Sequence, residues 1–370
     1  SENLAILEGK SIGIVTNHTA ILSNRTHLVD TLHALNVNII ALFGPEHGIR
    51  GDAPAGKKID DGVDELTQIP VYSLYGETRK PNEKMMKGID LLIFDIQDVG
   101  ARFYTYISTL YYILQTGAEY NVPVIVLDRP NPIGGVKVDG PIRKENQHSF
   151  VGIAPIPIMH GLTVGELAKL FVEENYIKTA SKPELIVIKM KNWSREFYFD
   201  ETNLPWVDPS PNINSLETAI VYPGTCFIEG TNLSEGRGTY EPFIVFGAPF
   251  IQADTLIHKL IELGTKGFEI EPFYFQPADI PRMAANPKHK GEICYGARIN
   301  VTDRNEFEPV QFGINLIYSV HKLFPESLQF RESFFNRLLG DEVVLQKIKN
   351  GIHPDEIISS WQDELNEFKI

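Results

Sequence analysis

The stretch Asn38-Ile-Ile-Ala-Leu-Phe43-Gly-Pro-Glu-His-Gly48 decides the fold prediction. Its first half is a nearly continuous apolar run of strand length, and its second half is a turn bounded by glycine and proline. Such a run is typical of a parallel strand that is buried on both faces. Similar runs occupy 11–17, 90–95 and 123–128, and apolar residues at helical spacing predict helices at 104–115 and 163–174. The first part of the chain is therefore predicted to be α/β.

The second part of the chain has a different order of predicted strands and helices. Strands are predicted at 242–247 and 292–301, followed by helices at 308–323, 341–349 and 354–367, a pattern that favours an α+β unit. A proline-rich stretch from Trp206 to Asn212 places the junction within about 207–220. A length of 370 residues exceeds what one core usually supports. We therefore predict two domains, 1–212 and a smaller 213–370.

Composition narrows the class of protein. The hydrophobic content of 43% is ample for burial, and no apolar run is long enough to span a membrane. The formal charge of −14 argues against a nucleic-acid partner, since binding phosphates needs a basic surface. An anionic ligand would have to be bound by a few local arginines. Cys226 and Cys294 lie in apolar surroundings, as small buried residues do.

Polar side chains follow each predicted strand of the first domain. Because the carboxyl ends of parallel strands share one edge of a sheet, these residues should gather there. They are Asn17 and His18, Glu46 and His47, Asp95 and Asp98, and finally Asp128, Arg129 and Asn131. We take this edge as the predicted active face.

Glu46 and His47 are the foremost catalytic candidates. A surface glutamate is usually a helix cap or a salt-bridge partner, but the Gly/Pro-bounded turn at a strand end favours a catalytic role for Glu46. His47 could donate a hydrogen bond to a backbone carbonyl, change the pKa of the Glu46 carboxyl or bind substrate.

Three further segments have open interpretations. Asp95 is interpreted as a helix N-cap, whereas Asp98, Arg102, Tyr104 and Tyr106 suit contact with a sugar or peptide. The segment 128–132 is either a turn locked by prolines or a set of ligand contacts. The stretch 229–239 is too glycine-rich for a helix and is predicted to be a site loop.

Several catalytic classes lack their signatures. The stretch 51–57 has P-loop spacing, but Lys58 replaces the Mg²⁺-binding hydroxyl, and no G-x-G-x-x-G follows the first strand. The histidines and cysteines show no zinc-ligand spacing, and no G-x-S-x-G elbow is present. We predict neither a cofactor nor a metal.

Ordered motifs along the chain resemble the exo-β-N-acetylmuramidase family of the NamZ type, long known as a domain of unknown function. The motifs are Thr16-Asn-His-Thr19, Gly44-Pro-Glu-His-Gly48, Phe94-Asp-Ile-Gln-Asp-Val-Gly-Ala-Arg-Phe-Tyr-Thr-Tyr106, Leu127-Asp-Arg-Pro-Asn-Pro132, Pro157-Ile-Met-His-Gly-Leu-Thr163, Pro209-Ser-Pro-Asn212 and Tyr222-Pro-Gly-Thr-Cys-Phe-Ile-Glu-Gly-Thr-Asn-Leu-Ser-Glu-Gly-Arg-Gly-Thr239.

The resemblance implies a Rossmann-like catalytic domain, an auxiliary C-terminal domain and a cleft between them. It implies release of N-acetylmuramic acid from the non-reducing ends of peptidoglycan fragments, such as muropeptides or disaccharides, in cell-wall degradation and recycling. It also implies export to the periplasm or the exterior, and a chain that starts at Ser1 fits either a mature secreted protein or a trimmed one. We expect the loop 229–239 to close one wall of the cleft.

Roles for individual residues follow from the resemblance and from the chemistry of glycosides. Glu46 matches the family's catalytic glutamate and is assigned as acid/base, and Glu235, Asp98 and Glu229, in that order, could supply a second carboxylate. Arg102, Arg129 or Arg237 could bind the lactyl carboxylate. The other predicted substrate contacts are His160, Asn212 and Asn232. Elimination by a related lyase and sugar binding without chemistry are the alternatives.

Overall fold

The computed structural model describes residues 3–46, 48–51, 61–76 and 78–369. These residues form two compact units. Unit 1 comprises Ser1–Gly100, Tyr104–Gly135 and Leu162–Ser210, and unit 2 comprises Ala101–Phe103, Val136–Gly161 and Pro211–Ile370. The chain thus passes between the units several times, and a single functional boundary at residue 212 stays a prediction. No helix in the described part of the chain is long and apolar enough to cross a membrane.

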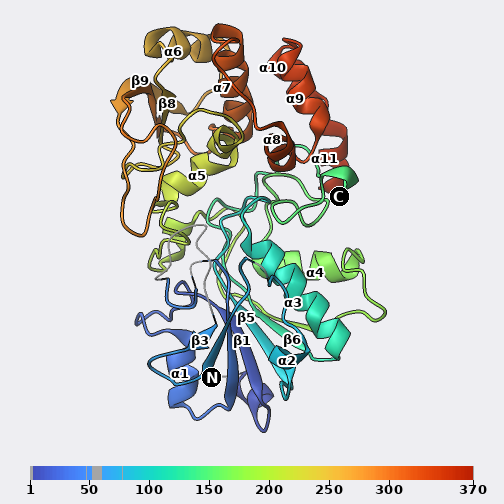
Figure 1. Ribbon diagram of the computed structural model, residues 1–370. Helices are drawn as coiled ribbons and strands as arrows, with labels where there is room; N and C mark the ends of the chain where they lie inside the picture. The colour runs from blue at the N-terminus through green and yellow to red at the C-terminus, as the bar shows by residue number, and fades with distance from the viewer. Residues whose placement is uncertain (1–2, 47, 52–60, 77, 370) are drawn as a thin grey trace. The chain divides into compact units, whose positions relative to one another are not determined.

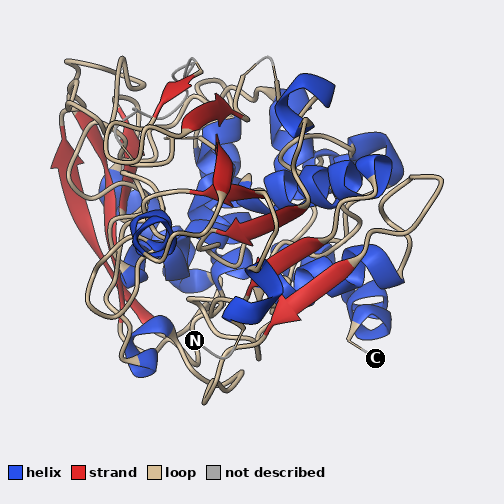
Figure 2. Cartoon of the chain, turned by 90° about the horizontal axis from the view of Figure 1, so that it is seen from below, coloured by secondary structure: helices blue, strands red, loops and turns tan. Residues whose placement is uncertain are grey.

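Unit 1 is built on a seven-stranded sheet in the order β3-β4-β2-β1-β5-β6-β7, in which all pairs except β3–β4 are parallel (Figure 1). The strands are β1 (Ile12–Thr16), β2 (Ile39–Gly44), β3 (Gly62–Val63), β4 (Pro70–Ser73), β5 (Leu91–Asp95), β6 (Val124–Leu127) and β7 (Leu185–Ile188). The helices are α1 (Leu28–Ala34), α2 (Glu83–Met86), α3 (Tyr106–Tyr120) and α4 (Val164–Glu173), with 3₁₀ turns η1 (Leu4–Leu7) and η3 (Phe199–Thr202). The predicted α/β class and the four predicted strands are confirmed. Figure 2 shows the strands turned relative to one another, as parallel sheets twist.

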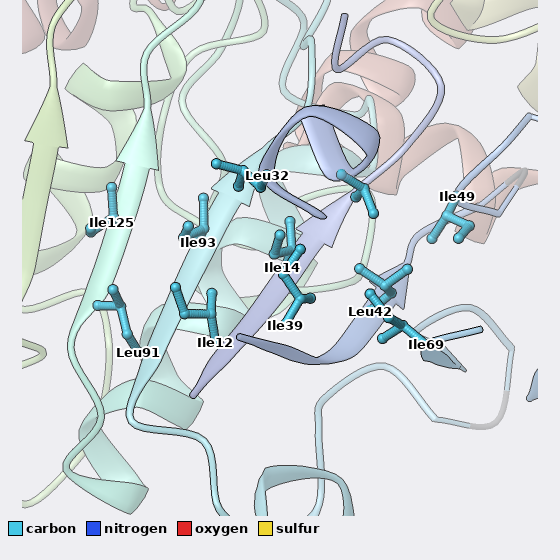
Figure 3. Close-up of a cluster of buried hydrophobic side chains, with 11 residues drawn as sticks. Ile12, Ile14, Leu32, Ile39, Leu42, Ile49, Ile69, Leu91, Ile93 and Ile125 are labelled. Carbon is cyan, nitrogen blue, oxygen red and sulfur yellow. The ribbon is translucent and has the colours of Figure 1, made fainter. Parts of the chain in front are cut away.

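Helices cover both faces of this sheet. Residues two apart in a strand share a face, and α1 packs its Leu32 against the face that carries Ile12 and Ile14 (Figure 3). On the opposite face, Gly117 of α3 approaches Val124 of β6 so closely that an added Cβ would lie 2.6 Å from its methyl group. Burial on both faces explains why these strands lack polar alternation.

Helix α4 begins where the sequence predicts. Thr163 is its N-cap: the Thr163 hydroxyl accepts from Glu166 N at 3.2 Å, and Thr163 N donates to the Glu166 carboxylate at 3.0 Å. This reciprocal capping box satisfies two backbone donors at the helix start.

Unit 2 is α+β, as predicted, with an antiparallel sheet in the order β8-β10-β9. Its strands are β8 (Val245–Ala248), β9 (Phe268–Phe275) and β10 (Cys294–Val301). Its helices are α5 (Leu216–Thr225), α6 (Ala253–Glu262), α7 (Pro309–Leu323), α8 (Glu332–Leu339), α9 (Glu342–Lys349), α10 (Pro354–Ser359) and α11 (Gln362–Phe368), with 3₁₀ turns η2 (Glu145–Gln147) and η4 (Cys226–Gly230). The single helix predicted over 354–367 is wrong, because α10 ends at Ser359 and α11 starts at Gln362.

Candidate active site

Glu46 lies in a tight turn immediately after β2. Pro45 is buried and Glu46 is partly buried. The turn closes through a bond from Gly48 N to Pro45 O of 3.0 Å, and Gly48 adopts a positive φ of 74° that favours glycine. His47 lies outside the described residues. Strand β2 thus positions the backbone immediately before Glu46.

Two buried tyrosines accompany Glu46 in unit 1. The rings of Tyr104 and Tyr106 meet edge to face with centroids 4.8 Å apart, and Tyr106 donates its hydroxyl proton to Pro209 O at 2.8 Å. Burial raises the pKa of both phenols, and the negative charge of Glu46 raises it further. Both tyrosines therefore stay neutral hydrogen-bond donors around neutral pH, near the Glu46 carboxylate.

Asn17 and His18 follow β1 at the same sheet edge. The Asn17 side-chain oxygen accepts from Thr19 N at 3.0 Å and from its hydroxyl at 2.5 Å, which shapes the turn. His18 donates through Nε2 to Asp208 O at 2.7 Å. Gly51 has a φ of 77°, and a Cβ there would lie 2.6 Å from the His18 ring. The imidazole is therefore held from two sides.

The segment after the Glu46 turn is anchored by Arg50. Its guanidinium makes two bonds of 2.9 Å to Asp64 and bonds of 2.8 and 3.1 Å to Asp30. Burial alone would raise the pKa of Asp64, but the hydrogen bonds from Arg50 and Thr67 outweigh it and lower the pKa from 3.8 to about 2. Asp64 is 5% exposed. Arg50 and Asp64 thus form a salt bridge four residues after Glu46 in the chain, and we call this salt bridge the clamp.

We predict that this clamp makes the stability of unit 1 depend on acidic pH. Because the folded-state pKa of Asp64 is depressed, its contribution is present above pH 3.8 and is lost as the pH falls through about 2. Asp64→Asn should therefore lower the free energy of unfolding by about 2 kcal/mol at pH 7, and the deficit should shrink in acid. Urea unfolding at several pH values checks this, and a deficit that does not change with pH would contradict it.

Asp98 and Asn131 hold turns. Asp98 accepts from Gly100 N at 2.8 Å, and Gly100 has a φ of 87°. Asn131 accepts from Ile133 N and donates to Leu162 O, both at 3.2 Å. A Cβ on Gly100 would lie 2.3 Å from the Asn131 oxygen, so these two turns fit together only with glycine there.

The predicted N-cap role of Asp95 is wrong. Helix α3 has Thr105 as its N-cap residue, and Asp95 instead pairs with Arg129, whose Nε and Nη2 bind its two oxygens. Both oxygens of Asp95 thus pair with Arg129, and the predicted role of Arg129 as a substrate fork stays a prediction. Asp128 accepts from Gly165 N at 2.8 Å and from Arg129 N at 3.0 Å, which ties β6 to the start of α4, and burial raises its pKa.

The glycine-rich loop of unit 2 brings three predicted residues together. Arg237 donates through Nε and Nη2 to Glu229 Oε1 at 3.0 and 2.8 Å, and its Nε lies 3.4 Å from Glu235 Oε1. The guanidinium also stacks over Phe243 at 5.2 Å. Glu235 is 4% exposed, whereas the Arg237 side chain keeps 28% exposure. All three arginines considered have partners in the structure, and Arg237 keeps the largest exposed fraction of the three.

Sequence reasoning missed the segment that supports this loop. Between β9 and β10, Lys288 binds the carbonyls of Ile228 and Leu233 as well as Glu235, and His289 Nε2 donates to Asn232 O at 2.6 Å. No local motif marks these residues, because their partners are about 55 positions away in the chain.

Arg102, a predicted substrate contact, is engaged by backbone carbonyls, and its contact with substrate stays a prediction. Its side chain is 0% exposed within unit 2. Nη1 donates to Pro141 O at 2.6 Å and Ile156 O at 2.8 Å, and Nη2 donates to Leu338 O at 2.8 Å. Leu338 lies in the last turn of α8, so the guanidinium caps the negative end of that helix. Arg102 therefore has a structural role.

The three remaining predicted contacts lie in unit 2, where His160 and Asn212 are buried and Asn232 is partly buried. His160 is 0% exposed. Asn212 is 1% exposed, and its side-chain amide donates to Met283 O at 2.8 Å. Asn232 donates to Ser327 O and accepts from Gln329 N, both at 2.9 Å. Their substrate contacts stay predictions. Among the described residues, no group of three His, Cys, Asp or Glu is arranged to hold a metal ion.

Comparison with known proteins places this geometry in a family. The family model for the N-terminal part of the exo-β-N-acetylmuramidase NamZ matches residues 12–217, and the model for its C-terminal part matches 220–370. The chain belongs to the NamZ family. A relative from Bacillus subtilis strain 168, the peptidoglycan β-N-acetylmuramidase NamZ, is 45% identical over 98% of this chain and 85% of its own length.

Two solved structures share the NamZ fold seen here. Both are DUF1343 family proteins from Bacteroides fragilis NCTC 9343. One has a TM-score of 0.91 at 34% identity, and the other a TM-score of 0.80 at 35% identity. Each match covers 100% of this chain and 94% of the solved one. The likeness extends over both units.

Proposed function

We propose that this protein is a glycosidase that releases N-acetylmuramic acid from the non-reducing ends of peptidoglycan fragments. The observation that carries the proposal is the 45% identity, over nearly the whole chain, to a peptidoglycan β-N-acetylmuramidase. The site chemistry supports it, because a glycosidase needs a carboxyl group near the leaving oxygen, and Glu46 is held in a rigid turn at the sheet edge. We also propose that the protein acts in cell-wall recycling and that it does so outside the cytoplasm. Fractionation of cells that express the full-length protein tests this location.

In the proposed mechanism, Glu46 exchanges a proton with the leaving oxygen. Tyr104 is a neutral phenol beside it and can donate to a sugar oxygen or to the carboxylate itself, whereas the hydroxyl proton of Tyr106 is donated to Pro209 O. A second carboxylate would then attack the sugar or activate water, and Glu235 is our first choice for it. The lactyl carboxylate would pair with Arg237, whose guanidinium keeps some exposure.

Exo action predicts the time course on glycan strands that begin with N-acetylmuramic acid. The free monosaccharide should form from the start, while the remaining strand shortens one end at a time. Strands that begin with N-acetylglucosamine are the matched control and should resist the enzyme. Early accumulation of mid-length fragments would indicate an endo enzyme.

Mass spectrometry of the released sugar separates the chemical alternatives in the same experiment. Hydrolysis adds the elements of water to the sugar, whereas elimination leaves an unsaturated sugar that is lighter by one water. A protein that binds the strand and releases nothing would contradict glycosidase activity.

A further inference from the structure

His27 joins the start of α1 to the turn that follows β1, within unit 1. Its Nδ1 accepts from Val29 N at 3.3 Å, so the side chain is the N-cap of α1. Its other ring nitrogen, Nε2, lies 2.8 Å from Asn17 O. A carbonyl oxygen can only accept, so Nε2 carries the proton and Nδ1 keeps its lone pair for Val29 N. The two bonds together require the neutral imidazole with its proton on Nε2.

The surroundings of His27 favour this neutral form. The residue is 7% exposed, and burial lowers the pKa of its imidazole below the usual value. The bond to Asn17 O raises this pKa, and the guanidinium of Arg50 lowers it. The carboxylates of Asp30 and Asp95 raise it by smaller amounts. The net shift of the pKa is downward, so His27 is neutral around neutral pH.

The turn that receives the His27 bond is also tied to the sheet. The Thr19 hydroxyl, which donates to Asn17 Oδ1, accepts from Gln97 N at 3.0 Å, and Gln97 Nε2 donates to Pro130 O at 2.7 Å. The carboxyl ends of β1, β5 and β6 are thus joined by side chains that are 0% (Asn17), 3% (Thr19) and 5% (Gln97) exposed. Through Asn17 O, His27 connects this buried network to α1.

The amide nitrogen of Asn17 is the part of the network left for a ligand. Oδ1 is taken by the two bonds from Thr19, and Nδ2 is buried and makes no hydrogen bond of standard geometry within the described residues. The side chain lies beside Tyr106: burial and then Glu46 raise the pKa of that phenol, whereas Asn17 lowers it, as a hydrogen-bond donor does. An amide nitrogen has two N–H bonds, so a donor remains for a sugar oxygen.

We propose that His27 is a positioning residue whose bond to Asn17 O fixes the Asn17 amide, so that Nδ2 donates to an oxygen of the bound sugar. This inference rests on the proposed function and deepens it, because it adds a neutral donor for the substrate near Glu46. His27 itself does not touch the sugar. A histidine suits this position because one ring provides an acceptor for α1 and a donor for Asn17 O at the same time.

Two substitutions separate the two bonds of His27. His27→Asn keeps an acceptor for the helix cap, but its side chain has no atom that reaches Asn17 O. His27→Gln keeps an amide N–H at the position of Nε2 and loses the cap. We expect His27→Asn to lower kcat/KM on a chromogenic N-acetylmuramic acid glycoside by roughly ten- to hundredfold, and His27→Gln to keep most of the activity. A purely structural cap gives the opposite order, because His27→Asn is then the milder change.

His33→Asn is the matched control, because His33 is an exposed histidine of the same helix and should behave as wild type. Circular dichroism spectra confirm that the variants are folded. A His27→Asn variant with wild-type kcat/KM, or a His27→Gln variant that is impaired as strongly as His27→Asn, would overturn the proposal.

A measurement without substrate keeps this test independent of the proposed function. In ¹⁵N-labelled protein, the histidine ring signals report the tautomer, and the set lost in His27→Gln identifies His27. This set should show a neutral ring with its proton on Nε2. The side-chain amide signals of Asn17, identified by their loss in Asn17→Asp, should shift in His27→Asn and stay nearly unchanged in His27→Gln.

A proton on Nδ1 of His27, or Asn17 signals that do not respond to His27→Asn, would overturn the proposal. An inactive wild type with the expected signals would instead refute the muramidase proposal and leave the positioning of Asn17 by His27 intact.

Discussion

Glu46→Gln is expected to lower turnover of a chromogenic N-acetylmuramic acid glycoside by ~10² or more while the protein stays folded. The amide keeps the shape of the side chain but cannot transfer a proton. The turn should tolerate the change, since its closing bond from Gly48 to Pro45 involves only the backbone. Steady-state kinetics with both proteins, together with circular dichroism spectra, measure the effect.

Glu65→Gln is the matched control, because Glu65 is an exposed glutamate of the same unit. Its turnover should equal that of the wild type. A Glu46→Gln variant with wild-type turnover would remove Glu46 from the mechanism. A variant with lower kcat that recovers at a different pH would instead show that the amide perturbs a neighbouring titratable group.

The sequence predicts the central strands of unit 1 because they are buried on both faces. The runs at β1, β2, β5 and β6 have no polar alternation, which is the pattern of strands covered on both faces. Strands β3 and β4 escape prediction for the opposite reason. Residues of β3 are exposed, the strand is only two residues long, and β4 begins with a proline. A two-residue exposed strand at the sheet edge and a strand that begins with proline carry little hydrophobic signal.

Local sequence patterns could predict where the site residues lie on the sheet, but not their long-range partners. The strand-end argument correctly places Asn17, Glu46 and Asp98 on one sheet edge, since that edge follows from parallel pairing. It cannot tell a substrate contact from a structural partner. Arg129 reaches Asp95 across 34 positions, and this pairing depends on strand order, which no local pattern encodes.

Arg102→Met should destabilise unit 2 by about 3 kcal/mol or more, and any loss of activity should follow the loss of folded protein. The guanidinium is the donor for three buried carbonyls, and each buried acceptor left without a partner costs ~1 to 3 kcal/mol. Burial, followed by the charge of Arg143, lowers the pKa of Arg102 to about 9, so the site tolerates the cation only through these carbonyls and the end of α8. Urea unfolding followed by circular dichroism measures the change.

Arg298→Met is the control, because Arg298 is a half-exposed arginine of unit 2 that pairs with Glu241, and its loss should cost less than about 1 kcal/mol. A folded Arg102→Met variant that loses activity only on muramic substrates would instead support the prediction that Arg102 contacts the substrate.

Gly340 offers a second way to disturb the same contact. It ends α8 with a φ of 74°, and an added Cβ would lie 2.6 Å from Arg102 Nη2. Gly340→Ala should therefore combine backbone strain with displacement of the guanidinium and cost about 1 to 3 kcal/mol. Because both substitutions damage one contact, the double variant should lose less stability than the sum of the two single losses. Strictly additive losses would mean that Gly340 and Arg102 stabilise unit 2 independently, and the capping of α8 by Arg102 would then lose its support.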